Sequence, residues 1–178
     1  RLFYFGRLDV HIKGLDLLLS AFSEIATITN AELTFQGPSG DGHELLRRKA
    51  SQVSATENIT FRAPEYVKHP SLVFSDYDIF CMPSQFEGFG LSALEAMIAG
   101  RVVLVSREAG IASYVEASGC GVVVNPDVSA IKLGLLELCQ KRSAWKNMGM
   151  NGRDYALNNL RWDDTAVDAA RNYRSVMG

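Results

Sequence analysis

Two basic side chains in one short loop are the first residues of this sequence that suggest a chemistry. Arg7 and Lys13 lie between Gly6 and Gly14, directly after the apolar run Leu2–Phe5. That run predicts a buried strand, so the two cations stand at its carboxyl end, on either side of a turn that precedes a helical pattern. A basic pair in a loop is usually solvated surface charge, but at this position it is also suited to a diphosphate.

A second loop, from Pro83 to Leu91, also follows an apolar run and contains two glycines. Gly88 and Gly90 let the backbone approach a ligand closely, and the amides of Phe89, Gly90 and Leu91 would begin the helical run that follows. The amino end of a helix carries about half a positive charge, which favours an anion. The glycines alone are explained equally well as turn residues.

Two carboxylates stand beside this predicted anion cradle, where they would repel a bare diphosphate. Glu87 precedes the helical run and Glu95 lies inside it, between apolar neighbours. Carboxylates accept hydrogen bonds from hydroxyl groups, so Glu87 could bind a sugar ring and Glu95 the two hydroxyls of a ribose. The pattern predicts a nucleoside-diphosphate sugar, with its charge offset by the cations and the helix end and without a metal ion.

The elements that must position these loops are read from hydrophobic periodicity. Short apolar runs predict six strands, at Leu2–Phe5, Glu32–Phe35, Asn58–Phe61, Tyr77–Met82, Val102–Val105 and Gly121–Val124. Helical patterns separate them, at about 15–26, 41–54, 65–75, 90–99 and 111–117, and three more follow around 131–139, 143–157 and 163–177, the last capped by Asp163 or Asp164.

This alternation predicts an open, doubly wound, Rossmann-like α/β fold. The strands are apolar along their whole length, which is typical of a parallel sheet covered by helices on both faces. Ligands bind such sheets beyond the carboxyl ends of the strands, where the strand order reverses between the first strand and the one that opens the second half. We therefore expect the loops of Arg7 and Gly90 to meet.

Composition narrows the class of protein. The 178 residues, 47% hydrophobic and 21% charged, suit one globular domain over 1–178, and a net charge of −2 gives no reason to expect a nucleic-acid partner. Cys81, Cys120 and Cys139 are widely spaced among apolar neighbours, which predicts buried, reduced thiols in a cytoplasmic setting. No export signal or membrane span is evident, and a chain that enters a strand directly from Arg1 suggests a part of something longer.

The two loops together resemble a known family. The stretch Met82–Gly100 contains EGFGLSALEAMIAG, an E-x7-E pattern, and resembles the carboxyl-terminal domain of retaining GT-B glycosyltransferases of the family 4 type, also called group 1. The segment GRLDVHIKG near the start is similar to the same family, and the order of elements matches over essentially the whole chain.

The resemblance implies roles for the matching positions. Arg7 and Lys13 would hold the donor diphosphate, Glu87 the transferred sugar and Glu95 the ribose, with the amides of Phe89, Gly90 and Leu91 around phosphate and sugar. It implies a parent enzyme that transfers a hexose-type sugar with retention and needs no metal or other cofactor. The acceptor, a sugar, a lipid-linked compound or another molecule, would bind an amino-terminal lobe that this chain lacks, and peripheral membrane association of the parent stays open.

Two other functions share this sheet. A non-catalytic nucleotide-binding module could use the same crevice for regulation. A dinucleotide-dependent dehydrogenase is disfavoured, because no G-x-G-x-x-G follows the first strand.

Three further groups are weighed by their place in the predicted sheet. Asp76 and Asp78 spell D-x-D but open a strand at the end opposite the crevice, so we assign them no metal. Ser106, Arg107 and Glu108 follow the fifth strand and should lie near the crevice, where they are candidates to touch the acceptor or the other lobe. His11 is interpreted as a loop residue rather than a catalyst, and His43 and His69 have no supporting partners.

Overall fold

Six parallel strands form one sheet with the order β3-β2-β1-β4-β5-β6 in a computed structural model that describes residues 1–38, 41–161 and 170–175. The strands are β1 (Leu2–Phe5), β2 (Leu33–Gln36), β3 (Ile59–Arg62), β4 (Ile79–Met82), β5 (Val102–Ser106) and β6 (Gly121–Val124). All six predicted strands are present. The order reverses between β1 and β4, so the predicted switch point is confirmed.

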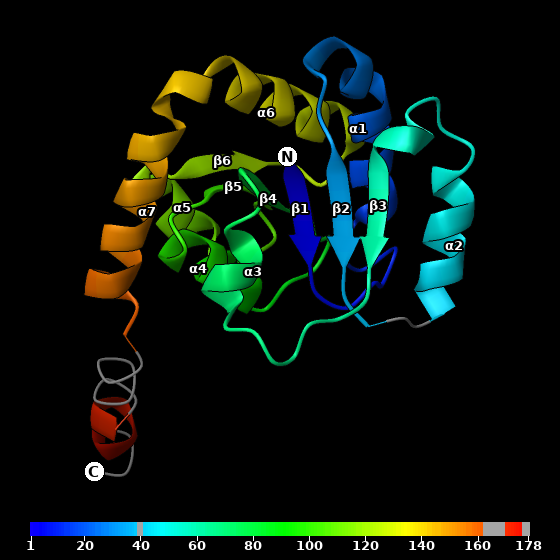
Figure 1. The fold of residues 1–178 in the computed structure, drawn as a ribbon. Helices are drawn as coiled ribbons and strands as arrows, with labels where there is room; N and C mark the ends of the chain where they lie inside the picture. Colours follow the sequence, from blue (N-terminus) through cyan, green and yellow to red (C-terminus); the bar gives the residue numbers. More distant parts are fainter. Residues whose placement is uncertain (39–40, 162–169, 176–178) are drawn as a thin grey trace.

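Helices cover both faces of the sheet (Figure 1). They are α1 (Leu15–Thr29), α2 (Asp41–Ala50), α3 (Pro70–Phe74), α4 (Leu91–Ile98), α5 (Ala112–Ser118), α6 (Val128–Gln140) and α7 (Trp145–Asn159), with short 3-10 turns at Thr56–Asn58 and Arg142–Ala144. Helices α1, α2 and α6 supply one apolar core, and α3, α4, α5 and α7 supply the other.

The strands β1 and β4 are apolar throughout because each side chain enters one of these two cores, whereas Thr60 and Arg62 of the edge strand β3 are exposed. In β1, Leu2 and Tyr4 belong to the core under α1 and α6, whereas Phe3 belongs to the core under α3 and α4. Phe3 stacks on Tyr77 with ring centroids 3.8 Å apart and meets Phe74 edge to face. Burial on both sides fixes the register of β1, and with it the point where the loop of Arg7 begins.

Two helical predictions differ from the structure. The pattern at 65–75 forms a helix only from Pro70, because the residue before a proline is biased away from the helical region and Glu65 turns the preceding segment by accepting from the amides of Val67 and Lys68. The helix predicted at 41–54 ends at Ala50 in the structure.

The last helical prediction, 163–177, is helical at residues 170–175, while its proposed caps Asp163 and Asp164 lie outside the described residues. Within the described ranges, every helix is too short or too polar to span a bilayer.

The minor sequence predictions are mostly confirmed. Asp78 lies at the amino end of β4, where its amide donates to the carbonyl of Arg1 at 3.0 Å, so the D-x-D pair is remote from the carboxyl edge. The three cysteines are free thiols, and Cys81 and Cys120 are buried. Cys139 is only half-buried, because it lies on the side of α6 that borders solvent at the amino edge of the sheet.

Candidate functional site

The two predicted loops enclose one hollow at the carboxyl ends of β1 and β4. Its volume is about 520 Å3, and it is lined by Tyr4, Gly6, Arg7, Lys13, Met82, Glu87, Phe89, Gly90, Leu91 and Ser92. Of the eight residues predicted for the site, six line this hollow, and Gly88 and Glu95 do not. The central expectation, that both loops face one space, is confirmed.

Backbone contacts hold the two loops against each other. The amides of Gln85 and Phe86 both donate to the carbonyl of Ile12, at 2.9 and 3.4 Å. Gly14 has a φ of 62°, and a Cβ at this position would lie 2.2 Å from the carbonyl oxygen of Pro83. Glycine is therefore required at position 14 both by its backbone conformation and by the close approach of the second loop.

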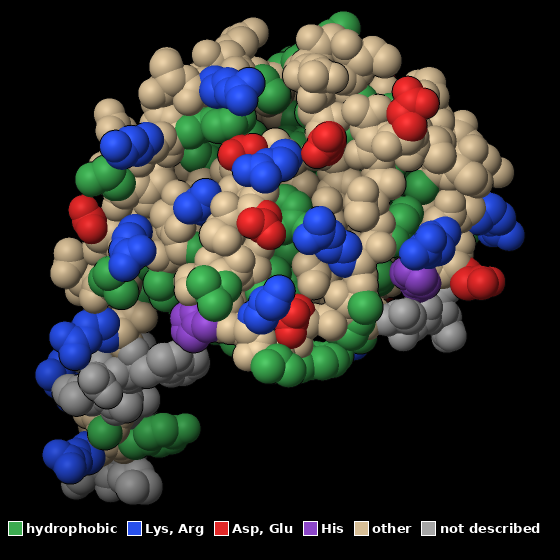
Figure 2. All heavy atoms as spheres, in the orientation of Figure 1, with side chains coloured by type: hydrophobic (Ala, Val, Ile, Leu, Met, Phe, Trp, Pro, Cys, Tyr) green, Lys and Arg blue, Asp and Glu red, His purple; other side chains and the backbone are tan. Residues whose placement is uncertain are grey.

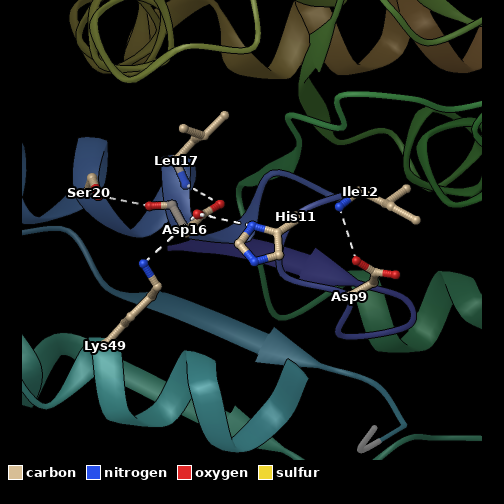
Figure 3. Close-up of polar contacts among 7 residues, drawn as sticks. All are labelled: Asp9, His11, Ile12, Asp16, Leu17, Ser20 and Lys49. Atoms are coloured by element: carbon tan, nitrogen blue, oxygen red, sulfur yellow. Dashed lines mark hydrogen bonds and ion pairs between the residues drawn. The ribbon is translucent and has the colours of Figure 1, made fainter. Parts of the chain in front are cut away.

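The loop of Arg7 and Lys13 is folded by its own polar groups (Figure 3). The side chain of Asp9 accepts from the amide of Ile12 at 3.0 Å, and its carbonyl accepts from the amide of Lys13 at 3.2 Å. At the start of α1, Asp16 lies 3.7 Å from His11 and 4.0 Å from Lys49. His11 thus serves the loop's own structure, as expected from its sequence context.

Lys13 and Glu87 form an ion pair across the hollow, with Nζ and Oε2 2.6 Å apart. Both side chains are 19% exposed, so solvent screens this pair less than a surface pair. The sequence predicted both residues for the site but not their pairing. In this state Lys13 is neutralised by Glu87, and a diphosphate would compete with the carboxylate for the ammonium group.

Tyr4 is a residue of the site that the sequence analysis missed. Its hydroxyl donates to the carbonyl of Arg7 at 2.7 Å and so fixes the start of the first loop. Burial, followed by the negative charges of Glu87 and Asp9, raises the pKa of this phenol above its ordinary value. The alternation of β1 could have indicated that Tyr4 shares a side of the strand with Leu2, but not that its polar tip reaches the loop.

The guanidinium group of Arg7 is available to a ligand. The Arg7 side chain is exposed and makes no ion pair with any residue in the described part of the chain. It is one of the residues that line the hollow. Arg7 is therefore the cation of the site that a bound anion can reach without breaking an existing pair.

The amino end of α4 supplies the amides of the predicted cradle. Gly90 precedes the helix with a φ of 105°, and its carbonyl accepts from the amides of Ala93 and Leu94 at 2.9 and 3.1 Å. The amides of Leu91 and Ser92 have no intrahelical acceptors, because the first turn of a helix leaves its donors free. Both residues line the hollow.

The reasons for glycine differ between the two predicted glycine positions of this loop. A Cβ on Gly90 would lie 2.6 Å from Cε of Met82, so Gly90 is required by packing as well as by conformation. A Cβ on Gly88 would meet nothing within 4 Å, and Gly88 is exposed. A need for glycine at position 88 would therefore have to come from a ligand.

Glu95 lies in the second turn of α4 and outside the lining of the hollow. It is half-buried, and burial raises the pKa of its carboxyl group, while the charge of His69 acts in the opposite direction. His69 caps α3, where its Nδ1 lies 2.8 Å from the hydroxyl of Ser71. The predicted ribose contact of Glu95 stays a prediction.

A larger hollow, of about 690 Å3, opens at the amino edge of the sheet between Asn30, Asp78 and Trp145. It contains none of the predicted site residues. Volume alone would favour it, but ligands of doubly wound sheets bind at the carboxyl edge, where the charged groups and helix amides described above converge.

Comparison with known proteins gives the family. The family model described as glycosyl transferases group 1 matches residues 1–155. The chain belongs to this family. A mannosyltransferase of Mycolicibacterium smegmatis, named GDP-mannose-dependent alpha-(1-6)-phosphatidylinositol monomannoside mannosyltransferase, is 31% identical over 84% of the chain and 41% of its own length. An uncharacterized glycosyltransferase of Methanocaldococcus jannaschii is 29% identical over 98% of the chain and 44% of its own length.

Solved structures agree on the fold of this group 1 glycosyl transferase chain. Sucrose-phosphate synthase of Thermosynechococcus elongatus has a TM-score of 0.82 at 25% identity. The match covers 99% of this chain and 45% of the synthase chain. The C-terminal domain of a group 1 family protein of Francisella tularensis has a TM-score of 0.77 at 22% identity, over 90% of the chain and 86% of its own. The chain spans less than half the length of the curated relatives described above.

Proposed function

We propose that the hollow between β1 and β4 binds the diphosphate of a nucleoside-diphosphate sugar, and that the full-length parent transfers this sugar to an acceptor. The observation that carries the proposal is convergence. Arg7, Lys13, Glu87 and the free amides of α4 line a single space of about 520 Å3. One relative is named as dependent on GDP-mannose, which supports a donor of this class.

The charges of the site suit a leaving group of this kind. Arg7 and Lys13 carry two positive charges, Glu87 carries one negative charge, and the end of α4 adds about half a positive charge. When a diphosphate takes the ammonium group of Lys13, Glu87 is released to accept from sugar hydroxyls. The same groups, fixed before the reaction, would stabilise the charge that develops on the departing diphosphate.

The finer parts of the proposal follow from the family resemblance. We propose that the chain is the donor-binding, carboxyl-terminal lobe, that transfer proceeds with retention, and that no metal is needed because the cations and amides offset the diphosphate. EDTA in the binding assay should then leave the affinity unchanged. The free thiols support a reducing, cytoplasmic setting. The acceptor would bind the other lobe.

Lys13→Ala tests the site directly. UDP-, GDP- and ADP-sugars should be titrated separately into the chain, with binding followed by ligand-detected NMR. For the best ligand, Lys13→Ala should weaken binding about tenfold, the loss expected for one charge-assisted hydrogen bond. Lys132→Ala is the matched control, since Lys132 of α6 forms an ion pair of the same length, 2.6 Å, with Glu24 of α1, and neither residue lines the hollow.

Equal binding by the unsubstituted 178-residue chain and by Lys13→Ala would show that the hollow is not the binding site. Equal losses in Lys13→Ala and Lys132→Ala would show that net charge rather than the site determines binding.

A further inference from the structure

The loop that carries Glu87 contacts the loop of Lys13 through Gln85 and Phe86, and it also contacts the connection between β5 and α5. Glu87 and Ala109 pair as in a parallel bridge, and the amide of Gly110 donates to the carbonyl of Glu87 at 3.3 Å. The amide of Ile111 donates to the carbonyl of Phe89 at 2.9 Å. The conformation of the loop 83–90 therefore depends on the segment 106–111, which contacts the hollow through none of its own side chains.

Ser106 joins the two segments at their base. Its hydroxyl donates to the carbonyl of Ser84 at 2.5 Å and accepts from the amide of Glu108 at 3.1 Å. Ser84 and Ser106 are both 0% exposed. The buried hydroxyl of Ser106 thus satisfies the carbonyl of Ser84 in the loop 83–90, where water has no access to replace it, and the partly buried amide of Glu108 in the segment 106–111.

We propose that Ser106 is a positioning residue for the loop 83–90, setting the carboxylate of Glu87 and the backbone of Phe89 for the donor. The inference rests on the proposed function of the hollow. Without the hydroxyl, the carbonyl of the buried Ser84 is left unpaired, and the partly buried amide of Glu108 loses its acceptor. Relief of that cost requires the two segments to separate, and separation weakens the contacts made by Gly110 and Ile111.

The close fit of the two segments means that separation would reach the site. A Cβ on Gly110 would lie 2.3 Å from the carbonyl oxygen of Gly88 and 3.2 Å from Cα of Phe89. Backbones in such contact have little room to adjust locally. A shift at the base of the segment 106–111 is thus passed to the residues that line the hollow.

Ser84 provides a matched control for this inference. It is as buried as Ser106 and adjoins it, but its hydroxyl has no hydrogen-bond partner in the described structure. Ser84→Ala therefore removes the same atom from the same surroundings without removing a hydrogen bond. A role for Ser106 that depended only on volume or burial would give the two variants equal effects.

The test combines hydrogen exchange with binding, on the 178-residue chain. In Ser106→Ala, the amides of Gly110 and Ile111 should exchange roughly tenfold faster, while the amides between β1 and β2 keep their rates. UDP, GDP and ADP, titrated separately, should bind about threefold more weakly. Ser84→Ala should change neither quantity, and Ser106→Thr, which keeps the hydroxyl, should restore both. If Ser106→Ala does not fold, Ser106→Cys replaces it, because a thiol donates only weakly.

Unchanged exchange at Gly110 and Ile111, or equal changes in Ser106→Ala and Ser84→Ala, would overturn the positioning role while leaving the proposed function intact. If the unsubstituted 178-residue chain binds none of the three diphosphates, the proposed function is contradicted instead. The exchange rates alone then decide whether Ser106 holds the loop.

Discussion

At the scale of single residues, the two predicted site carboxylates differ in their cost to the fold. Glu87 is paired with Lys13, but Glu95 is half-buried with a raised pKa and makes no ion pair with the described residues. A carboxylate in that state destabilises the folded chain at neutral pH. Proteins retain such residues where activity needs them, which agrees with the role that the family resemblance implies for Glu95.

The pH dependence of stability tests this reading of Glu95. Burial raises the folded-state pKa above the ordinary value of 4.5, so the folded chain holds this proton to higher pH than the unfolded chain does. The associated stability is fully present below the unfolded value and is lost as pH rises through the folded one. Glu95→Gln should therefore be more stable than the unsubstituted chain at pH 7 by roughly 0.5 kcal/mol. The expected difference is small because solvent screens a half-exposed group.

Urea unfolding from pH 4 to pH 8 measures this difference, which should shrink toward the acid end of the series. Glu116→Gln, an exposed position on α5, should show no such trend. A loss of stability in Glu95→Gln at pH 7 would instead assign Glu95 a structural role.

At the scale of elements, the sequence predicted where strands and loops fall more reliably than how loops are held. Leu2–Phe5 and Val102–Ser106 are recognisable because both faces of each strand are buried. The pairing of Lys13 with Glu87 depends on a contact between loops 74 residues apart in sequence, which no local pattern encodes. The hydroxyl of Tyr4 reaches the carbonyl of Arg7, only three residues away, because of the way the loop turns after β1. Pro70, by contrast, was a readable signal for the late start of α3.

The contact between the two site loops can be tested at Gly14, with Gly119 as its match. Both glycines have nearly the same φ, 62° and 63°, so an added Cβ strains both backbones by about 1 kcal/mol. Only at Gly14 would the Cβ also meet a neighbour, the Pro83 carbonyl at 2.2 Å; at Gly119 nothing lies within 4 Å. Gly14→Ala should lower the free energy of unfolding by about 3 kcal/mol, and Gly119→Ala by about 1 kcal/mol.

Urea unfolding gives these two values, and titration with nucleoside diphosphates should show weaker binding for Gly14→Ala alone. If both variants lose the same stability and keep the same affinity, the approach of the two loops is not rigid enough to position the site.

At the scale of the whole molecule, the reversal of strand order and the family were predictable from the sequence, whereas the transfer activity of a full-length parent is a proposal. The order β3-β2-β1-β4-β5-β6 follows from alternating strands and helices with one reversal, and it places the two motifs together. The chain matches its curated relatives over about two-fifths of their length. Under the proposed function, the hollow at the carboxyl edge holds the donor and the acceptor binds elsewhere.

That geometry leads to a prediction for the isolated chain. Sugar transfer requires donor and acceptor to be held together in a reactive arrangement, and most of the rate gained by an enzyme from proximity is absent when only one partner is bound. The 178-residue chain should bind nucleoside diphosphate weakly but release none from a nucleotide sugar above the uncatalysed background, as measured by chromatography over many hours. Sustained release, dependent on Lys13 and on added acceptor, would show that this lobe carries the complete reaction centre. Joined to the amino-terminal lobe of the proposed parent, the chain should gain transfer and bind the donor more tightly, because a second surface would enclose the diphosphate.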